Sequence, residues 1–339
     1  MPKNILVTGA NGFIGRHVVH AALTKPAARV RLNQRSPRAA APHSGSAAET
    51  VHADLTDPAS LTGLCRDTDA VIHCASLVGG DHDSLRAVND LGTRALVDEA
   101  QRQGVRRIVY ISTAAVYGRG PFRGAGPAGL PQAPASAASR TRAAAERHVL
   151  AAGGTVLRPH LVYGTGDRWV LPGLAQLLRH LGTGIDCPTL HSAVDVGALA
   201  GLAVAAALHE DPLPAVLHAN HPRPISTSAL VRLVQGHLGL PRRAPLSLRR
   251  ATELARNSPR ALHHLAMLGT DHWFDSDPVW RALGCSPGPA PADGLVRHTG
   301  WYGPLLRTAP HRPHRTGPQR SRNRAAGAGL HSAGACLRP

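Results

Sequence analysis

The sequence predicts an α/β fold in which a doubly wound parallel sheet is followed by a smaller C-terminal lobe. Over the first 160 residues, short runs rich in β-branched residues alternate with helical stretches. A glycine-rich turn follows the first of these runs, and the periodicity becomes less regular after residue 160. The length of 339 residues fits one large α/β unit or a domain with an added lobe.

The elements follow from hydrophobic period and length. Strands are expected at residues 4–8, 29–33, 50–52, 70–73, 107–112 and 155–158, and helices at 13–23, 84–103 and 136–151. Beyond residue 160, helices are expected at 174–181, 196–209 and 228–238. Right-handed crossovers between parallel strands place a ligand at the carboxyl ends of the strands, where the strand order reverses.

Composition restricts the partners. The formal charge is +17, from 38 basic and 21 acidic residues, yet only Lys3 and Lys25 are lysines. Arginine in place of lysine, with abundant Ala, Gly and Pro, is typical of GC-rich coding sequence, and residues 303–339 carry seven Arg and no acid. We therefore expect a disordered basic tail at 303–339 and no nucleic-acid partner.

Other classes of protein are also disfavoured. No apolar run approaches the ~20 residues that span a bilayer, and the first apolar run is a five-residue strand rather than a signal peptide. A cytoplasmic protein without a membrane partner is expected. The five cysteines form no Cys-x-x-Cys pair, and His263-His264 lacks carboxylates at ligand spacing, so no metal site is expected.

The turn after the first strand carries the clearest motif, Thr-Gly-Ala-Asn-Gly-Phe-Ile-Gly at residues 8–15. Its glycines permit a tight turn, close approach of a pyrophosphate, and close packing of helix on sheet, while the helix N-terminus offers free N–H groups. This predicts a Rossmann-type dinucleotide site. The residues expected to hold the cofactor here are Gly9, Asn11, Gly12, Phe13, Ile14 and Gly15.

The end of the second strand selects between cofactors. An acidic residue there would accept from a ribose 2′-hydroxyl, but this segment carries Arg35, Ser36 and Arg38 and no carboxylate. Two arginines favour a 2′-phosphate, so NADPH is expected rather than NADH. Asp54 is placed to accept from the adenine amino group. Residues 1–159 are then mainly the NADP(H)-binding domain and 160–302 mainly a substrate-binding lobe.

Residues 118–135 interrupt the alternating pattern with a Gly/Pro-rich segment. The segment follows a strand end and is too rich in glycine for a helix. It is either a mobile lid over the site or a surface loop, and we favour the lid.

Several ordered motifs resemble those of the extended short-chain dehydrogenase/reductases, the NAD-dependent epimerase/dehydratase family. Beyond the glycine turn, the resemblance is carried over residues 3–302 by Asp54-Leu55, Val71-Ile72-His73-Cys74-Ala75, Asn89 with Gly92-Thr93, the run Ile111 to Gly118, Leu157-Arg158-Pro159, Val162-Tyr163-Gly164 and Trp301-Tyr302. The resemblance implies that Leu55, Cys74, Ala75 and Pro159 also lie at the cofactor.

The family's catalytic centre combines a Ser/Thr that polarises the substrate oxygen with a Tyr and, four residues later, a Lys. Thr113 matches the first member. Counting back from Glu146 places Ala138 at the tyrosine position and Arg142 at the lysine position, and no tyrosine of this chain has a lysine four residues later. Arg142 can still bind a ribose hydroxyl, but a guanidinium keeps its protons in proteins and is therefore a poor proton source.

Loss of the Tyr/Lys pair disfavours epimerases and dehydratases, which need a base, more than reductases. A ketone polarised by Thr113 could accept hydride, and a phenol beside it could supply the proton. The Ala/Arg replacement resembles the tailoring ketoreductases of angucyclinone pathways, which implies a flat polycyclic aromatic ketone as substrate. The residues expected to contact it are Tyr117, Phe122, His160 and Trp169.

Two of these residues have other roles that we favour over substrate contact, namely packing for Tyr117 and a structural role for His160. A redox-silent NADP(H)-binding sensor is the alternative function, followed by a sugar-nucleotide epimerase or dehydratase. The oligomeric state does not follow from the sequence.

Overall fold

Seven strands form one parallel sheet in the order β12-β7-β5-β4-β1-β2-β3. The structure, a computed structural model, describes residues 2–36, 48–238 and 243–308. The strands are β1 Lys3–Thr8, β2 Ala28–Gln34, β3 Glu49–His52, β4 Ala70–His73, β5 Arg107–Ile111, β7 Thr155–Arg158 and β12 Val216–His218. The Rossmann-type α/β fold expected from the sequence is confirmed, and the six strands predicted for this sheet lie within a residue or two of their expected bounds.

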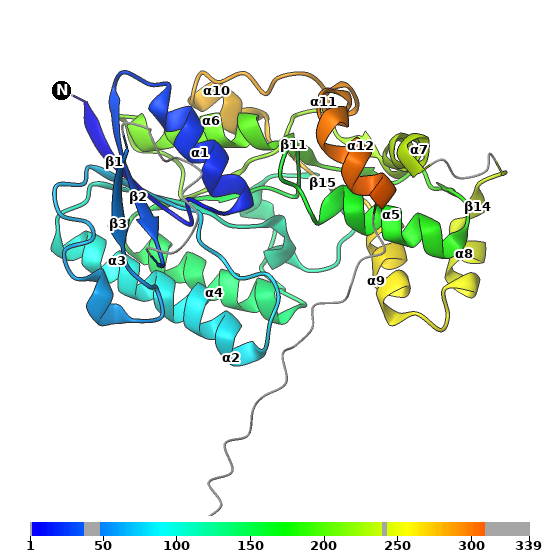
Figure 1. Ribbon diagram of the computed structural model, residues 1–339, viewed down its shortest axis with the longest axis horizontal. Helices are drawn as coiled ribbons and strands as arrows, with labels where there is room; N and C mark the ends of the chain where they lie inside the picture. Colours follow the sequence, from blue (N-terminus) through cyan, green and yellow to red (C-terminus); the bar gives the residue numbers. More distant parts are fainter. Residues whose placement is uncertain (1, 37–47, 239–242, 309–339) are drawn as a thin grey trace, which may run out of the picture. The chain divides into compact units, whose positions relative to one another are not determined.

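Both faces of the sheet are covered by helices (Figure 1). Helices α1 (Phe13–Leu23), α6 (Val196–Leu208) and α10 (Asp277–Ala282) pack on one face, and α3 (Gly92–Arg102) and α4 (Ala137–Ala151) on the other. Alternate residues of β1 serve the two cores, since Ile5 and Val7 pack beneath α1 and α6 while Leu6 faces the α3 side. Burial on both faces explains why this strand is a continuous apolar run.

The strand order reverses beside β1. From β1 the chain builds β2 and β3 on one side, then crosses to β4 and builds the rest of the sheet on the other side. The carboxyl ends of β1 and β4 therefore border the crevice in which open α/β sheets bind ligands. The glycine turn lies at this position.

The helix expected at 84–103 begins two residues earlier and is interrupted. It consists of α2 (His82–Leu85), a π-helical turn (Arg86–Leu91) and α3. Asn89 explains the wide turn, because its buried side chain accepts from the backbone N–H of Leu77 at 2.7 Å and donates to the Leu77 carbonyl and to Thr141 Oγ1. Periodicity alone does not reveal such a turn.

The Gly/Pro-rich segment at 118–135 is not the free lid that its composition predicts. It contains β6 (Phe122–Ala125), which pairs in parallel with β15 (His272–Phe274), and a short 3-10 turn at Pro127–Gly129. β6 is the edge of a second sheet, whose other strands are β10 (Leu190–His191) and β13 (Ile225–Ser226). The strand was missed because its partner lies about 150 residues away in the sequence.

Residues beyond 160 build most of the second lobe. Two small pairs, β8 (Leu161–Tyr163) with β11 (Ala193–Asp195) and β9 (Ile185–Asp186) with β14 (Leu246–Ser247), accompany the second sheet. The lobe's helices are α5 (Val170–Leu181), α7 (Thr227–Leu238), α8 (Leu248–Leu254), α9 (Pro259–Leu268), α11 (Pro291–Arg297) and α12 (Thr299–Thr308). The predicted helix at 174–181 therefore starts four residues earlier than expected.

The boundaries drawn from the sequence are crossed in both directions. β6 lies before residue 160 but joins the lobe's sheet, while α6 and β12 lie after it and join the main sheet. A disordered tail was expected from residue 303, but α12 continues to Thr308 and buries Tyr302 and Leu306 in the lobe core. Residues 309–339 lie outside the described part. No described helix has the length and apolarity to span a bilayer.

Candidate active site

The glycine turn between β1 and α1 is closed by backbone contacts that leave no room for side chains. Gly9 has φ +67°, and a Cβ there would lie 2.6 Å from the backbone nitrogen of Ala75. A Cβ on Gly15 would lie 2.0 Å from the Gly9 carbonyl oxygen. Gly12 precedes the first helical residue, Phe13, without a side-chain cap. The N-terminal N–H groups of α1 thus remain available for an anion.

Unpaired polar atoms gather around this turn. Within the described residues, six buried side-chain nitrogen or oxygen atoms have no hydrogen-bond partner. Four of them, Asn11 Oδ1, Gln34 Nε2, Ser76 Oγ and Arg142 Nε, stand at the carboxyl ends of β1, β2, β4 and β5. Buried polar atoms are normally paired, so this concentration fits a polar ligand such as a dinucleotide. Gln34 and Ser76 were not singled out from the sequence, although Gln34 ends β2 and Ser76 lies three residues after β4.

Thr113 ends the segment after β5 and begins a 3-10 turn at Ala114–Tyr117. Its Oγ1 accepts from the Ala115 backbone N–H at 3.1 Å, which fixes the side chain. A hydroxyl that accepts in this way still has its proton to donate. The side chain is half-buried, so a substrate oxygen can reach that proton.

Ala138 and Arg142 lie one turn apart on α4, on the same face of the helix. Arg142 Nη2 donates to the Ile111 carbonyl at 2.6 Å, which brings the guanidinium to the end of β5. The helix is started by Ser136, whose Oγ accepts from the Ser139 N–H in a capping box. At Ala138, where the resemblance implies a tyrosine, the chain offers a methyl group and no proton.

The residues expected at the adenosine end surround the end of β2. Arg35 is exposed and follows directly on Gln34, while Ser36 is partly exposed. Arg38 lies outside the described residues. Asp54 Oδ1 accepts from the backbone N–H and the hydroxyl of Thr56 at 2.9 and 2.8 Å, so one carboxylate oxygen is engaged in its own turn.

The remaining cofactor candidates form the packed wall behind the site. Leu55 is buried against Gly92, Ala75 packs on Gly9, and the Pro159 carbonyl accepts from the Ala114 N–H. Cys74 donates its backbone N–H to Thr8 and burial raises the pKa of its thiol to about 12. A thiol of that pKa stays protonated, which excludes a thiolate role at neutral pH.

Tyr117 lies in the core rather than at a substrate surface. Arg158 Nη1 donates to its hydroxyl at 2.7 Å, and the hydroxyl donates to His218 Nε2 at 2.7 Å, since His218 Nδ1 faces the Asp275 carbonyl. Burial raises the pKa of Tyr117. Arg158 is in turn paired with Glu146, which also accepts from Ser112. The phenolic proton is therefore committed to a buried network.

The other three substrate candidates do not lie together. Phe122 packs against Tyr117, Phe274 and His272, and His160 stacks on His272 with ring centroids 5.5 Å apart. Trp169 stands at the start of α5 with 60% of its surface exposed. The structure thus brings Phe122 and His160 into one aromatic cluster and leaves Trp169 outside it.

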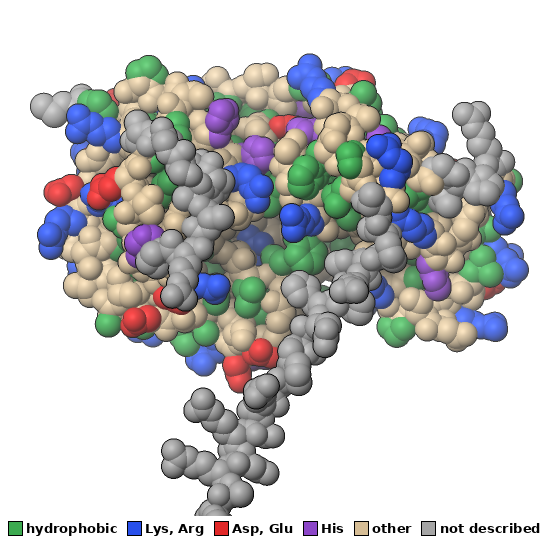
Figure 2. Space-filling model, in the orientation of Figure 1, with side chains coloured by type: hydrophobic (Ala, Val, Ile, Leu, Met, Phe, Trp, Pro, Cys, Tyr) green, Lys and Arg blue, Asp and Glu red, His purple; other side chains and the backbone are tan. Residues whose placement is uncertain are grey.

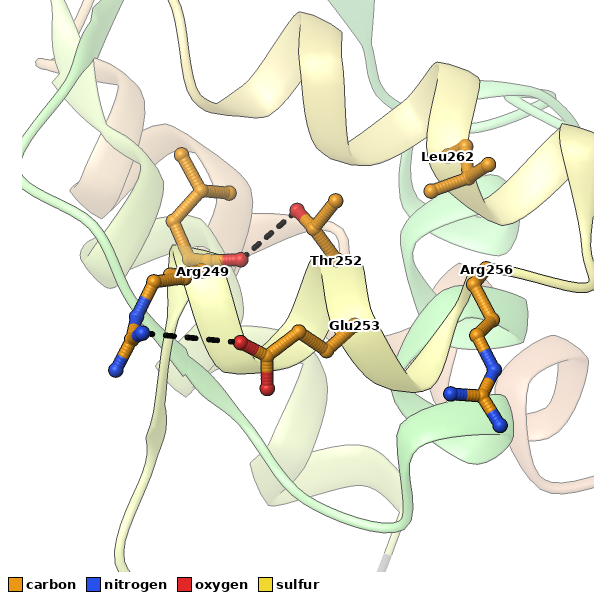
Figure 3. A pocket seen from close by; sticks show the side chains of 6 residues that line it. Arg249, Thr252, Glu253, Arg256 and Leu262 are labelled. Carbon is orange, nitrogen blue, oxygen red and sulfur yellow. Dashed lines mark hydrogen bonds and ion pairs between the residues drawn. The ribbon is translucent and has the colours of Figure 1, made fainter.

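A hollow elsewhere in the lobe does not resemble a catalytic site. It measures about 690 Å³ and is lined by α8 and its neighbours, with Arg249 paired to Glu253 and Leu262 opposite (Figure 3). Its lining includes none of the predicted site residues. On the face shown in Figure 2, the described basic side chains stand in separate groups among neutral ones, without a continuous basic track.

Three features of the site are typical of a nicotinamide-dependent oxidoreductase. They are the glycine turn between β1 and α1, the buried polar atoms without partners around it, and Thr113. The chain belongs to the NAD dependent epimerase/dehydratase family, whose model matches residues 5–192. Two relatives are reductases. A 2-alkyl-3-oxoalkanoate reductase of Stenotrophomonas maltophilia is 29% identical over 86% of this chain and 97% of its own. A 4-hydroxy-2-methyl-3-oxo-4-farnesyl-3,4-dihydroquinoline-1-oxide ketoreductase of Stigmatella aurantiaca is 31% identical over 51% of this chain and 54% of its own.

Solved structures show the same fold at lower identity. UDP-glucose 4-epimerase of Thermotoga maritima superposes with a TM-score of 0.70 at 19% identity, covering 89% of this chain and 99% of that one. UDP-glucuronic acid 4-epimerase of Bacillus cereus, solved with NAD, gives 0.68 at 20% identity over 90% and 100%. At about 20% identity, this likeness supports the fold and does not identify the substrate.

Proposed function

We propose that this protein is an NADPH-dependent ketoreductase that reduces a ring ketone of a polycyclic aromatic polyketide of the angucyclinone type. The observation that carries the proposal is the pairing of a retained Thr113 with Ala138 and Arg142 on α4. In this respect the chain resembles the 7-oxo reductase of simocyclinone biosynthesis. The two reductase relatives support reduction of an oxo group.

The side chains of Ala138 and Arg142 on α4 suit reduction of a ketone better than oxidation of an alcohol. Oxidation of an alcohol begins with removal of its proton, and neither Ala138 nor the guanidinium of Arg142 is a base. Reduction needs hydride, which the reduced nicotinamide supplies when bound, and a donor toward the carbonyl oxygen. Thr113 provides that donor through its free hydroxyl proton.

The proton for the product is assigned to the substrate. A ketone with a phenol on the adjacent ring position holds that phenol in a hydrogen bond. As the carbonyl carbon gains hydride, its oxygen takes the phenolic proton and the alcohol forms. Water then returns a proton to the phenolate, so one ketone, one NADPH and one proton give one alcohol and one NADP⁺. Arg142 holds the ribose side of the site and offers positive charge.

The preference for NADPH rests on the end of β2. Arg35 is exposed directly after the strand, and the segment carries no carboxylate before Ser36. A guanidinium at this position suits a 2′-phosphate.

Incubation of the full-length protein with NADPH and an angucyclinone ketone tests the proposal. We expect loss of absorbance at the reduced-nicotinamide band with formation of the alcohol by mass. Tight NADPH binding without turnover on any phenol-flanked ketone would instead identify a sensor. Isomerisation of a UDP-sugar without net cofactor change would identify an epimerase.

Two changes, one in the protein and one in the substrate, test whether the proton comes from the substrate phenol. If the substrate supplies it, Ala138→Tyr leaves kcat largely unchanged, whereas O-methylation of the substrate phenol lowers it by about 100-fold or more. A large gain from Ala138→Tyr, or full activity on the methyl ether, would contradict the substrate-assisted step. Ala138→Phe is the matched control, because it adds the ring without the hydroxyl.

A further inference from the structure

Three histidines from distant parts of the chain meet beside the aromatic cluster. His160 follows the end of β7, His191 lies in β10 and His272 begins β15. β10 and β15 are parallel neighbours in which His191 stands opposite His272. The three ring centroids are 5.5 to 6.0 Å apart, and one nitrogen from each ring lies within 4.8 Å of the others.

Hydrogen bonds fix the tautomer of His272. His272 Nδ1 lies 2.8 Å from the Thr270 carbonyl, and because a carbonyl only accepts, Nδ1 carries the hydrogen. His272 Nε2 is then a lone pair, and it is buried without any partner. His191 Nε2 lies 3.3 Å from the Leu268 carbonyl and 2.9 Å from Thr227 Oγ1. The His191 tautomer with its proton on Nε2 donates to that carbonyl and leaves Nδ1 as a lone pair.

The lone pair of His272 Nε2 is costly unless something binds it, because it is buried without a partner in a residue that is 2% exposed. His272 also donates its other N–H to a backbone carbonyl, as metal-ligating histidines usually do. The three rings are nearly parallel, with interplanar angles of 14–19°, so their nitrogens converge on one ion only after the rings rotate. Three imidazole ligands suit zinc, which binds imidazole in a tetrahedral geometry.

A glycine lies next to His272. A Cβ on Gly120 would lie 3.2 Å from His272 Nε2, and Gly120 has φ +77°. Contraction of the three nitrogens around one ion requires rotation of the rings, since Zn–N bonds are about 2.0–2.1 Å. A side chain at position 120 would crowd the His272 ring in that rotation.

We propose that His160, His191 and His272 form a three-histidine zinc site that joins the end of β7 to the second sheet. The sequence predicted no metal site, because its ligands are single histidines 31 and 81 positions apart with no motif around them. The proposal is independent of the ketoreductase assignment, since zinc binding is measured without substrate or NADPH.

The test uses the full-length protein, stripped with a chelator and titrated with Co²⁺ and then Zn²⁺. We expect one tight equivalent of Co²⁺ with the visible bands of a tetrahedral nitrogen site, displaced by Zn²⁺, and a higher melting temperature with Zn²⁺. His272→Gln and His191→Phe should weaken binding by about 100-fold or more, because loss of an outer-shell partner alone costs 10–100-fold.

A double variant, His263→Ala with His264→Ala, is the control, because these adjacent histidines lie on α9 away from the three ligands. It should bind like the unmodified protein. His160→Phe keeps a ring in the stack if His272→Gln fails to fold, as checked by circular dichroism. Absence of a stoichiometric site, or loss of the site only in the His263/His264 variant, would overturn the proposal.

Discussion

At the scale of single residues, the proposed mechanism assigns the largest share of the chemistry to Thr113. Its Oγ1 caps the 3-10 turn at Ala114–Tyr117, and its proton is free for a carbonyl oxygen. Thr113→Ala should lower kcat by about 100-fold, the usual cost of one donor to a developing oxyanion, with little change in NADPH affinity. Thr113→Ser keeps both roles and should retain most activity. Equal kcat values for the two variants, in steady-state assays, would contradict this role.

Arg35 governs the choice of cofactor in this account. A charge-assisted hydrogen bond to the 2′-phosphate is worth roughly 1.5–3 kcal/mol, so Arg35→Gln should raise the Kd for NADPH by about 10-fold or more. The Kd for NADH should change little. Arg29→Gln is the matched control, because Arg29 is equally exposed but stands at the opposite end of β2. Fluorescence titration with both cofactors measures the ratio, and equal effects of the two variants would rule out a specific contact.

The role of a residue was predictable where a sequence motif or a fixed spacing determined it. Gly9, Gly12 and Gly15 were identified from the turn alone, and the absence of the Tyr/Lys pair followed from the lysine count. The packing role favoured for Tyr117 agrees with its burial, but its hydrogen-bond partners Arg158 and His218 were not predictable, because they lie 41 and 101 positions away. Gln34 and Ser76 emerge only as buried atoms without partners.

At the scale of elements, the β1–α1 turn is the least tolerant of added volume. A Cβ on Gly15 would lie 2.0 Å from a backbone oxygen, so Gly15→Ala must displace α1 from β1. We expect loss of NADPH binding and a destabilisation of about 2 kcal/mol or more. Gly236→Ala, in exposed α7 with nothing near its Cβ position, should instead be neutral or stabilising by up to about 1 kcal/mol. Urea unfolding and cofactor titration compare the two, and similar outcomes would refute the packing argument.

Elements with local signals were predicted well, and elements with distant partners were not. Six of the seven strands of the main sheet are β-rich runs between turns, so their bounds followed from the sequence. β6, β12 and the short strands of the lobe contain two to four residues and exist through pairing with remote segments. The π-helical turn at Arg86–Leu91 likewise depends on the contacts of Asn89 to Leu77 and Thr141.

At the scale of the whole molecule, buried neutral histidines tie stability to pH. Burial lowers the pKa of His73 to about 3 and that of His218 to about 4, from an ordinary value of 6.5. His73 is held neutral between Thr8 Oγ1, 2.6 Å from its Nδ1, and Thr93 Oγ1, 2.9 Å from its Nε2. Below pH 6.5 the unfolded chain binds protons that the folded chain does not, so stability falls as pH falls.

Each of these two histidines should lower the free energy of unfolding by up to about 1.4 kcal/mol per pH unit as the pH falls from 6 to 5. Urea unfolding at pH 8, 7, 6 and 5 measures the slope at constant ionic strength. His218→Gln removes one titrating group and should flatten the slope by about half of the contribution from the pair. A free energy of unfolding that does not fall from pH 7 to pH 5 would contradict the neutral, buried state of both rings.

The central claim is hydride transfer to a ring ketone, and isotopic transfer tests it most directly. NADPH deuterated at C4 of the nicotinamide, in each of its two stereoisomers, is incubated with the protein and a phenol-flanked polycyclic ketone. With one of the isomers, we expect an alcohol one mass unit heavier than the product from unlabelled NADPH, with deuterium on the former carbonyl carbon. An alcohol without deuterium from either isomer, or bound NADPH that is never oxidised, would contradict it.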